Sequence, residues 1–121
     1  MIHIQTKLKI IDNSGISIGQ CLKIYKKKIG QIGDIILIST KTLRSHKKIK
    51  INKGDIFKAL IIHTRYPQKS TIGNMIRFDE NCITILNNQM KPLGTRIFGP
   101  ITSEFRKQKQ FKIVSLASNI L

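Results

Sequence analysis

Apolar and polar residues alternate along much of the chain, and this period of two is the period of a β-strand. Residues 2–10 place isoleucine, threonine and leucine at the even positions, with polar or basic residues between them. Residues 16–24 repeat the alternation after Asp12-Asn13-Ser14-Gly15, a tight turn in which Asp and Asn bond the nearby backbone and Gly accepts a positive φ. The pattern therefore predicts two half-buried strands, the first with a cationic outer face.

The same pattern continues through the middle of the chain. Residues 35–43 begin with four consecutive apolar residues, which indicates burial on both faces at one end of a strand. A polar loop is expected at 66–74, where Pro67 and Gly73 interrupt the alternation. Further strands are predicted at 48–51 (a short ribbon closed by a turn at 52–55), 56–63, 75–78 and 82–86, the last two joined by Asp79-Glu80-Asn81.

The last third of the chain is expected to be irregular from Asn87 on, because two prolines and two glycines interrupt it. Ser103 is placed to cap a short helix at 104–108, and a second short helix is expected at 111–117. Many short strands joined by glycine-rich turns, without an internal repeat or a linker, are typical of a small closed barrel. We therefore predict a mainly β fold with one domain spanning residues 1–121.

The amino-acid composition predicts the kind of side chains in the core and indicates the base composition of the genome. Apolar residues make up 40% of the 121 residues but aromatic residues only 6%, and Trp is absent, so the core must be mostly aliphatic. Isoleucine, which favours strands, is about a fifth of the chain. The excess of isoleucine, lysine and asparagine is what an AT-rich genome encodes, in an organelle or an AT-rich bacterium. Because a strand is expected from residue 2, we expect no cleaved signal or transit peptide.

The net charge of +16 comes from 22 basic and 6 acidic side chains, and a small domain with this charge needs a polyanion to neutralise it. A membrane surface would require a basic amphipathic helix, which the sequence lacks, and no apolar run reaches the roughly 18 residues of a membrane helix. An acidic protein is the second alternative. Nucleic acid is the default partner.

The basic residues are concentrated in two parts of the chain. Residues 23–58 carry eleven basic and two acidic side chains, and residues 89–121 carry six basic and one acidic. Lysine outnumbers arginine by 17 to 5, and lysine suits phosphate, whereas arginine reads planar, bidentate targets. A single surface lysine is usually only solvated, but the cluster at 41–53 has no acidic residue to balance it. We expect the protein to neutralise a nucleic-acid backbone, with an affinity that falls steeply with salt.

Catalysis and metal binding are not expected. Four of the six acids lie at turns, where capping of the turn explains them: Asp12, Asp34, Asp55 and Asp79. The three histidines are dispersed without the spacing of metal ligands, and neither a nucleophile elbow nor a Gly-Lys-Ser/Thr phosphate loop is present. Cys21 and Cys82 are expected to be buried small hydrophobes. We therefore expect no enzyme, no cofactor and no metal.

Several motifs, in order along nearly the whole chain, resemble the family of the universal large-subunit ribosomal protein fourteen, in its bacterial-type branch. The strongest is the block from Ile76-Arg77-Phe78-Asp79 to Asn88, followed by Pro92-Leu93-Gly94-Thr95-Arg96-Ile97-Phe98-Gly99-Pro100. The others are Ile4-Gln5-Thr6, Asp12-Asn13-Ser14-Gly15, Gly33-Asp34-Ile35-Ile36, Lys53-Gly54-Asp55 and Lys112-Ile113-Val114-Ser115-Leu116-Ala117.

The resemblance implies a five-stranded β-barrel with a projecting β-ribbon and short C-terminal helices. It also implies a structural constituent of the large subunit, which binds large-subunit rRNA on the intersubunit face and reaches small-subunit rRNA at an intersubunit bridge. Its neighbours would be the large-subunit proteins numbered three and nineteen. In the bacterial-type branch a ribosomal silencing factor docks on the C-terminal face, at positions that match Thr95, Arg96 and Lys112.

The basic side chains that we predict to bind rRNA on these grounds are Lys7, Lys9, Lys23, Lys26, Lys27, Lys28, Lys41, Arg44, Lys47, Lys48, Lys50, Lys53, Arg77 and Arg96. The segment 94–100 is interpreted as a surface of close backbone approach, because Gly permits such approach and Pro fixes shape. An ordinary irregular connection is the alternative interpretation of that segment.

The chain departs from its relatives in three places. Ile16-Ser17-Ile18 stands where many relatives carry basic residues, the loop at 66–72 is poorer in charge, and the turn at 26–29 is shorter. These departures favour an organellar ribosome, mitochondrial first and plastid second, over a bacterial cytoplasm. The competing function is a free nucleic-acid-binding barrel of the cold-shock type, which would need an exposed aromatic face. The seven aromatic residues here are instead scattered.

Overall fold

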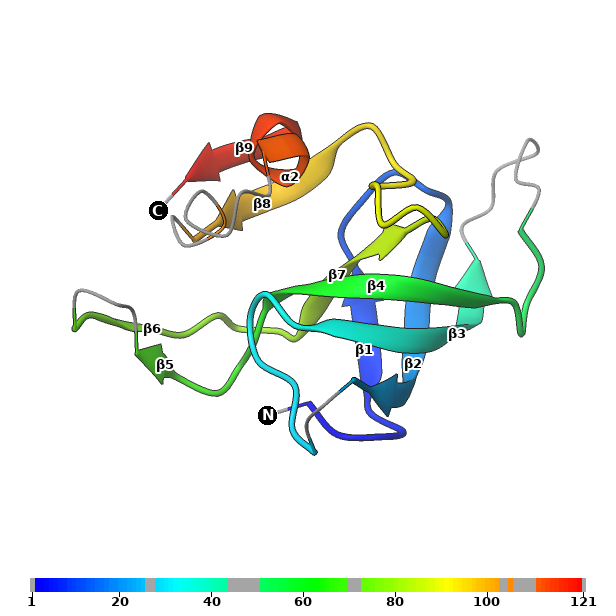
Figure 1. The fold of residues 1–121 in the computed structure, drawn as a ribbon, viewed down its shortest axis with the longest axis horizontal. Helices are drawn as coiled ribbons and strands as arrows, with labels where there is room; N and C mark the ends of the chain where they lie inside the picture. Colours follow the sequence, from blue (N-terminus) through cyan, green and yellow to red (C-terminus); the bar gives the residue numbers. More distant parts are fainter. Residues whose placement is uncertain are drawn as a thin grey trace.

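The structure is a computed structural model that describes residues 2–25, 28–43, 51–69, 73–102, 105 and 111–120. Five strands form a closed barrel in the order β1-β2-β3-β4-β7 (Figure 1). They are β1 (Lys7–Ile10), β2 (Ile16–Ile24), β3 (Ile35–Leu43), β4 (Ile56–His63) and β7 (Cys82–Leu86). Neighbouring strands are antiparallel except β1 and β7, which run parallel and close the barrel. The predicted mainly β fold with a five-stranded barrel is confirmed.

Aliphatic side chains fill the barrel, because alternate residues of each strand point inward. Fully buried members of this cluster include Leu8, Ile10, Ile36, Ile61 and Ile85. No buried aromatic side chain belongs to this cluster in the described part of the chain, as the composition predicted. Both cysteines are free and buried, Cys21 inside the barrel and Cys82 outside it, which confirms their predicted role as small hydrophobes.

A second layer lies against the outer surface of β4 and β7 (Figure 1). It consists of β8 (Ile97–Ile101), the helix α2 (Phe111–Leu116) and β9 (Ala117–Ile120), and β8 pairs with β9 in parallel. The second hydrophobic cluster fills the space between this layer and the barrel. Its buried members are Ile11, Leu60, Ile62, Cys82, Leu86, Ile97, Ile101, Phe105 and Ile113.

The prediction that the chain is irregular from Asn87 on was wrong, because β8 runs through Gly99 and Pro100. Glycine and proline shorten regular structure but do not prevent a five-residue strand with a register shift between Ile97 and Pro100. The second predicted helix is confirmed over 111–116, and Ala117 already belongs to β9.

The first strand is shorter than the alternation predicted. It begins at Lys7 instead of Ile2, because the chain turns at Gln5, whose φ is 74°. The Gln5 N–H donates to the Cys21 carbonyl at 2.7 Å, so this turn is held by β2. Ile2 is buried and bridges to Gly30, whereas Ile4 is 60% exposed, in contrast to its predicted inward position.

The polar loop predicted at 66–74 contains a strand, β5 (Gln68–Lys69), which pairs with β6 (Met75–Ile76) in a small ribbon beside the barrel (Figure 1). The predicted strand at 75–78 therefore ends at Ile76, and it forms no hairpin with β7. The reason is that β7 closes the barrel between β4 and β1. The connection crosses the end of the barrel, where the Phe78 N–H donates to the Thr64 carbonyl at 3.0 Å.

The strands predicted at 16–24, 35–43, 56–63 and 82–86 are confirmed with these bounds. Within β2 a register shift between Cys21 and Lys23 changes the alternation, so Leu22 is exposed. The projecting ribbon expected at 48–51 lies outside the described residues apart from Ile51. The helix expected at 104–108 also lies outside them, apart from Phe105, which is helical.

Candidate nucleic-acid interface

Strand register gathers lysines on the outer surface of β1, β2 and β3. Lys7, Lys9, Lys23 and Lys41 are all exposed. Cross-strand pairs lie on the same side of a sheet. Lys7 and Lys9 of β1 pair with residues of β2 that in turn pair with β3, and Lys23 of β2 pairs with β3 directly. The β3 residues reached in this way lie between 37 and 42, and this segment also contains Lys41. Since a strand rises about 3.3 Å per residue, these rows lie within roughly 17 Å along β3.

A fifth lysine reaches this surface through the turn that precedes β4. Asn52 N–H donates to the Asp55 carboxylate at 2.9 Å, and Gly54 takes a φ of 87°. The turn is fastened to Thr40 of β3, whose N–H donates to the Asp55 carbonyl and whose carbonyl accepts from the Gly54 N–H. Lys53 is exposed in this turn, which is bonded to Thr40, the residue before Lys41. We call the surface that carries Lys7, Lys9, Lys23, Lys41 and Lys53 the basic face.

The register also reveals a lysine that sequence reasoning missed. Lys58 of β4 pairs with Leu37, which pairs with Lys23, so the two lysines flank one position on the same side of the sheet. Lys58 is half-buried. The only sequence signal was its place within an otherwise apolar strand. Lys23 is also held in place, with its ammonium 5.3 Å from the centre of the Tyr25 ring.

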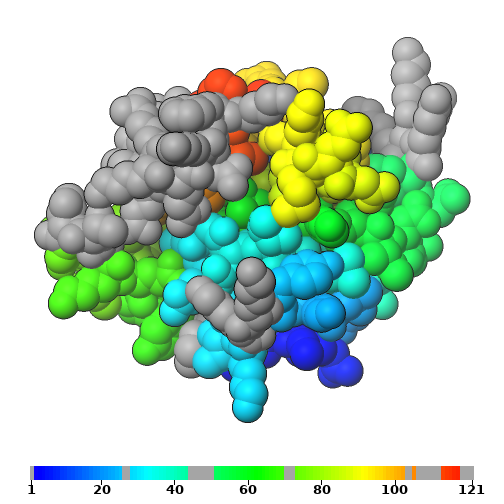
Figure 2. All heavy atoms as spheres, in the orientation of Figure 1, coloured from blue at the N-terminus to red at the C-terminus, as the bar shows by residue number. Residues whose placement is uncertain are grey.

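An acidic side chain partly neutralises the positive charge at one edge of the basic face. The Lys9 ammonium lies 3.2 Å from the Glu80 carboxylate, and both side chains are more than half exposed. A pair this exposed contributes at most about 1 kcal/mol, because water screens it. Figure 2 shows described residues of 16–25 and 28–43, blue to cyan, in the middle of this view, with the yellow residues next to them.

The remaining predicted rRNA-binding residues are placed elsewhere or are not described. Lys28, Arg77 and Arg96 are exposed but do not belong to the basic face, since Arg77 follows β6 and Arg96 precedes β8. Six predicted residues lie outside the described residues: Lys26, Lys27, Arg44, Lys47, Lys48 and Lys50. Sequence reasoning also left out three exposed basic residues away from the face: Arg65, Lys69 and Lys91.

The second candidate surface is held together by Asn13, which bonds a segment 82 residues further along the chain. The Asn13 side-chain oxygen accepts from the Thr95 N–H at 2.7 Å and from the Arg96 N–H at 3.1 Å, and its Nδ2 donates to Thr95 Oγ1 at 2.7 Å. A Cβ on Gly94 would lie 2.7 Å from that same Asn13 oxygen. The close approach predicted for Gly94 is therefore made to the chain's own turn.

Asp12 anchors this turn to the barrel. It is buried, and its carboxylate accepts from the Ser14 N–H at 3.1 Å and from the Ile85 N–H of β7 at 2.9 Å. The predicted capping of the turn by Asp12 is confirmed, and its bond to β7 is an addition. Asp12 also bridges to Ile97, the first residue of β8. One turn thus links β1, β7 and β8.

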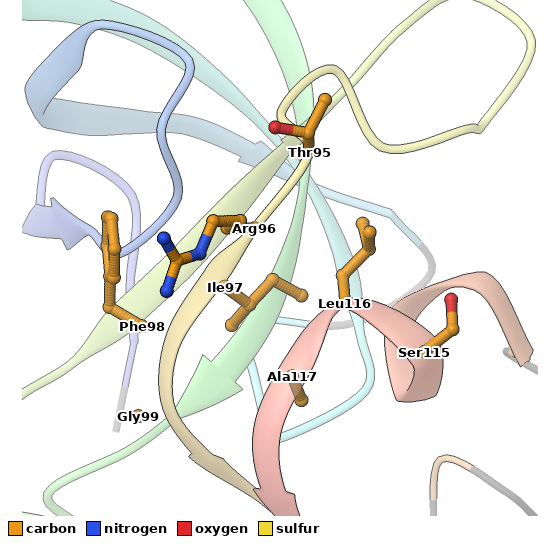
Figure 3. A pocket seen from close by; sticks show the side chains of 8 residues that line it. All are labelled: Thr95, Arg96, Ile97, Phe98, Gly99, Ser115, Leu116 and Ala117. Atoms are coloured by element: carbon orange, nitrogen blue, oxygen red, sulfur yellow. The ribbon is translucent and has the colours of Figure 1, made fainter.

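A hollow of about 400 Å³ lies between the β8 segment and the end of α2 (Figure 3). Thr95, Arg96 and Phe98 line one side, and Leu116 and Ala117 line the other. The Arg96 guanidinium lies 5.8 Å from the centre of the exposed Phe98 ring, which restricts its orientation. We call this surface the partner face. Lys112, the third residue predicted there, lies in α2, and its side chain is outside what the structure describes.

His63 fastens the second layer to the barrel at the end of β4. Its Nε2 donates to the Pro100 carbonyl of β8 at 2.6 Å, and its ring stacks on Phe78 with the ring centres 3.9 Å apart. Burial lowers the pKa of His63 from its ordinary value, so the imidazole is neutral at pH 7. The sequence predicted no role for His63 beyond its lack of the spacing of metal ligands.

The described cysteine and turn carboxylate side chains have structural surroundings. Burial raises the pKa of Cys21, and burial together with Glu80 raises that of Cys82 to about 11, so both thiols are protonated at neutral pH and are poor nucleophiles. Asp34 accepts from the Gln31 N–H at 2.8 Å, which confirms its turn-capping role beside that of Asp55. Within the described ranges, no group of three His, Cys, Asp or Glu side chains could hold a metal ion.

Membrane insertion through a helix finds no support in the part of the chain that the structure describes, since no helix there is long and apolar enough to cross a bilayer.

Fold and surface together define a small, strongly basic β-barrel protein with a second layer on one side. The family model of ribosomal protein L14p/L23e matches residues 1–121, the full chain, and the protein belongs to this family. It is therefore a structural protein of the large ribosomal subunit, a non-enzymatic kind of protein that works in the ribosome. The resemblance carried by the sequence motifs is confirmed.

Proposed function

We propose that the protein binds large-subunit rRNA through the basic face, on the intersubunit side of the subunit. The observation that carries this proposal is the gathering of five exposed lysines, from three strands and a turn, on one surface. Of these five, only Lys9 pairs with an acid among the described residues. Four exposed lysines without an acidic partner among the described residues raise the positive potential of this surface, which attracts a polyanion.

Phosphate contact is the mode of binding that this surface favours. Lysine ammonium groups on short strand-to-strand spacing neutralise closely packed phosphates without reading bases. Each phosphate contact releases counterions, so the affinity depends steeply on salt. The barrel contributes rigidity, because its closed ladder fixes the spacing of the lysines before RNA binds.

The partner face is proposed to serve contacts made by the assembled subunit. Asn13 holds the backbone of Thr95 and Arg96 so that both side chains are exposed beside the hollow. These residues, with Lys112, are the positions proposed for a ribosomal silencing factor or for the intersubunit bridge to small-subunit rRNA. The large-subunit proteins numbered three and nineteen are the proposed neighbours.

We also propose that residues 1–121 act as one domain and that the ribosome is organellar, mitochondrial first and plastid second. The support for the location is compositional, namely the excess of isoleucine, lysine and asparagine and the non-basic segment Ile16-Ser17-Ile18. Fractionation of cells that express a tagged copy tests it, since a tag recovered only with cytosolic ribosomes would exclude an organelle.

The experiment that tests rRNA binding is sedimentation of a tagged copy through a sucrose gradient at moderate salt, with and without RNase. We expect the protein to comigrate with the large subunit and with whole ribosomes, and to leave those fractions after RNase treatment. The triple variant Lys7→Ala/Lys23→Ala/Lys41→Ala should be depleted from the subunit. The matched control, Arg65→Ala/Lys69→Ala/Lys91→Ala, removes the same charge away from the basic face and should be incorporated.

Two results would contradict the proposal. A wild-type copy that remained at the top of the gradient would exclude assembly into the subunit. Equal incorporation of the two triple variants would show that the lysines of the basic face do not hold the RNA in preference to other basic residues.

A further inference from the structure

We propose that Lys58 and Lys23 form a preorganised pair that binds RNA phosphates at the β4 edge of the basic face, and that Lys58 is the lysine whose loss weakens binding most. Lys58 is half-buried and is not one of the five exposed lysines of the basic face. This pair rests on the proposed function, because its ligand is the rRNA that the basic face binds. It adds the side chains that hold the RNA backbone in one position.

The outer side of β4 becomes more buried along the strand. Ile56, Lys58 and Leu60 share this side, because alternate residues of a strand point the same way. Ile56 is 59% exposed, Lys58 is half-buried and Leu60 is 1% exposed, since the second layer covers the end of β4 that leads to His63 (Figure 1). Lys58 therefore lies at the border of the free barrel surface, where a lysine packs its stem on apolar neighbours and keeps its ammonium in water.

Apolar residues flank Lys58 on both neighbouring strands. It pairs with Leu37 of β3 and with Leu86 of β7, and Leu86 is only 4% exposed. Side chains of cross-strand pairs lie next to each other, so these two leucines confine the stem of Lys58. A confined side chain loses less conformational entropy when it binds, and this saving is large for lysine because its free side chain has many rotamers.

Lys23 occupies the matching place on the other side of Leu37. It pairs with Leu37 from β2, so the Cα atoms of the two lysines are separated by two strand spacings, or roughly 10 Å. The Lys23 ammonium lies 5.3 Å from the centre of the Tyr25 ring, and this cation–π contact restricts its position. With their four-carbon stems, two restrained lysines at this spacing reach neighbouring phosphates of one RNA strand.

The charge around the pair favours an anion. Neither Lys58 nor Lys23 forms an ion pair with any described residue. Three acids in the described part of the chain accept backbone N–H groups: Asp12, Asp34 and Asp55. Asp79 and Glu80 precede β7, whereas Lys58 pairs with the last residue of that strand. Lys41, on β3, adds positive charge on the side of Lys23.

A carboxylate of a neighbouring protein is the competing ligand. A single carboxylate neutralises one ammonium group, whereas an RNA strand presents one negative charge per nucleotide. Two lysines that flank one position of the sheet therefore match a repeated charge better than a single one. The adjoining lysines of the basic face continue the same pattern, so RNA is the ligand that the surface favours.

The test is the affinity of the full chain for large-subunit rRNA, measured by filter binding at one fixed salt concentration. Lys58→Met removes the charge and keeps an unbranched apolar stem, and we expect the affinity to fall about tenfold. The matched control, Lys7→Met, removes the same charge from an exposed lysine and should lower the affinity less than about threefold. Lys58→Arg keeps the charge and should remain within about threefold of wild type.

The double variant Lys23→Met/Lys58→Met measures the pairing. If the two ammonium groups hold neighbouring phosphates, loss of either one loosens the contact of the other. We therefore expect the double variant to lose less affinity than the product of the two single losses. The pair Lys7→Met and Lys58→Met, which lie on strands that are not neighbours, should instead lose the full product.

Equal losses for Lys58→Met and Lys7→Met would overturn the inference, as would a full product of losses in Lys23→Met/Lys58→Met. Wild-type RNA affinity of Lys58→Met together with its depletion from the large subunit would show that Lys58 faces a protein, and would overturn it as well. Failure of the wild-type chain to bind large-subunit rRNA would instead overturn the proposed function. Melting temperatures verify that the variants fold, and Lys58→Gln replaces Lys58→Met in the comparison if the latter melts at a lower temperature.

Discussion

The basic face and the partner face are positioned by different means. Lysines of the basic face stand on regular strands, and their spacing follows from the register of β1, β2 and β3. The partner face depends on side chains that reach across the sequence, since Asn13 holds the backbone 82 and 83 residues further on. Backbone hydrogen bonds between strands hold the basic face, so single side-chain substitutions should leave its arrangement intact. The side chains of Asp12 and Asn13 hold the partner face, so a substitution of either should disrupt it.

The largest effect is expected for Asp12→Ala, which removes the anchor between the two surfaces. The variant leaves the Ile85 N–H without its acceptor inside the protein and releases the turn at 12–15. We expect the free energy of unfolding to fall by roughly 3 kcal/mol, measured by urea denaturation. The matched control, Asp55→Ala, loses one exposed capping bond and should fall by about 1 kcal/mol. Equal losses would contradict the anchoring role of Asp12.

Protonation of His63 should destabilise the fold, because burial of the charged ring outweighs its hydrogen bond to Pro100. Because burial lowers its folded pKa below the ordinary 6.5, the unfolded chain binds the proton more readily. The stability that neutral His63 contributes is therefore present above about pH 6.5 and is lost as pH falls through the folded pKa. One proton changes stability by at most about 1.4 kcal/mol per pH unit.

Urea denaturation of wild type and His63→Gln between pH 7.5 and 5 measures this difference. The variant keeps a side-chain donor but has no group that titrates in this range, so its stability should fall less steeply with pH. Parallel curves for the two proteins would show that His63 does not link pH to stability.

Asn13→Ala should affect the partner face more than the whole fold. The Thr95 and Arg96 N–H groups lose their acceptor, and we expect about 1 kcal/mol less stability with faster hydrogen exchange at these two amides. Asn13→Asp keeps the acceptor oxygen and should retain slow exchange. Amides on β2 serve as the internal reference. Unchanged exchange at residues 95 and 96 in Asn13→Ala would contradict the account of this surface.

The smallest effect concerns two buried threonines. Thr84 Oγ1 is buried without a hydrogen-bond partner among the described residues, so Thr84→Val should stabilise the protein by about 1 kcal/mol. Thr40 Oγ1 donates to the Asn52 carbonyl at 2.8 Å, and Thr40→Val should instead destabilise by a similar amount, while also releasing the turn that carries Lys53. Melting temperatures report both signs. A destabilised Thr84→Val would show that its hydroxyl has a partner.

Sequence reasoning succeeded where local pattern and tertiary structure agree. Strands β3, β4 and β7 are rich in apolar residues and lie between glycine-containing or polar turns, and each was predicted with its observed bounds. It failed at residues 2–6, since the turn at Gln5 is fixed by the carbonyl of Cys21 on another strand. It also missed β8, because its pairing with β9 joins segments about twenty residues apart that carry no alternation.

For both surfaces, the local sequence predicted the residues involved but not the contacts that the fold makes between distant segments. Charge density identified the basic face, but the meeting of Lys23 with Lys58 requires the register across two strand pairs. The turn at 12–15 was recognised as a turn from its own residues. Its hydrogen bonds to Thr95 and Arg96 join two motifs, and neither motif alone predicts this contact.

The most direct measurement for the basic face is the salt dependence of the affinity for large-subunit rRNA, from filter binding between 50 and 300 mM KCl. Each lost phosphate contact lowers the slope of log K against log salt by about 0.7 to 0.9. For Lys7→Ala/Lys23→Ala/Lys41→Ala we therefore expect a decrease of about 2 to 3, with less than about 1 for Arg65→Ala/Lys69→Ala/Lys91→Ala. Equal slopes for the two variants would contradict the claim that the basic face holds the RNA.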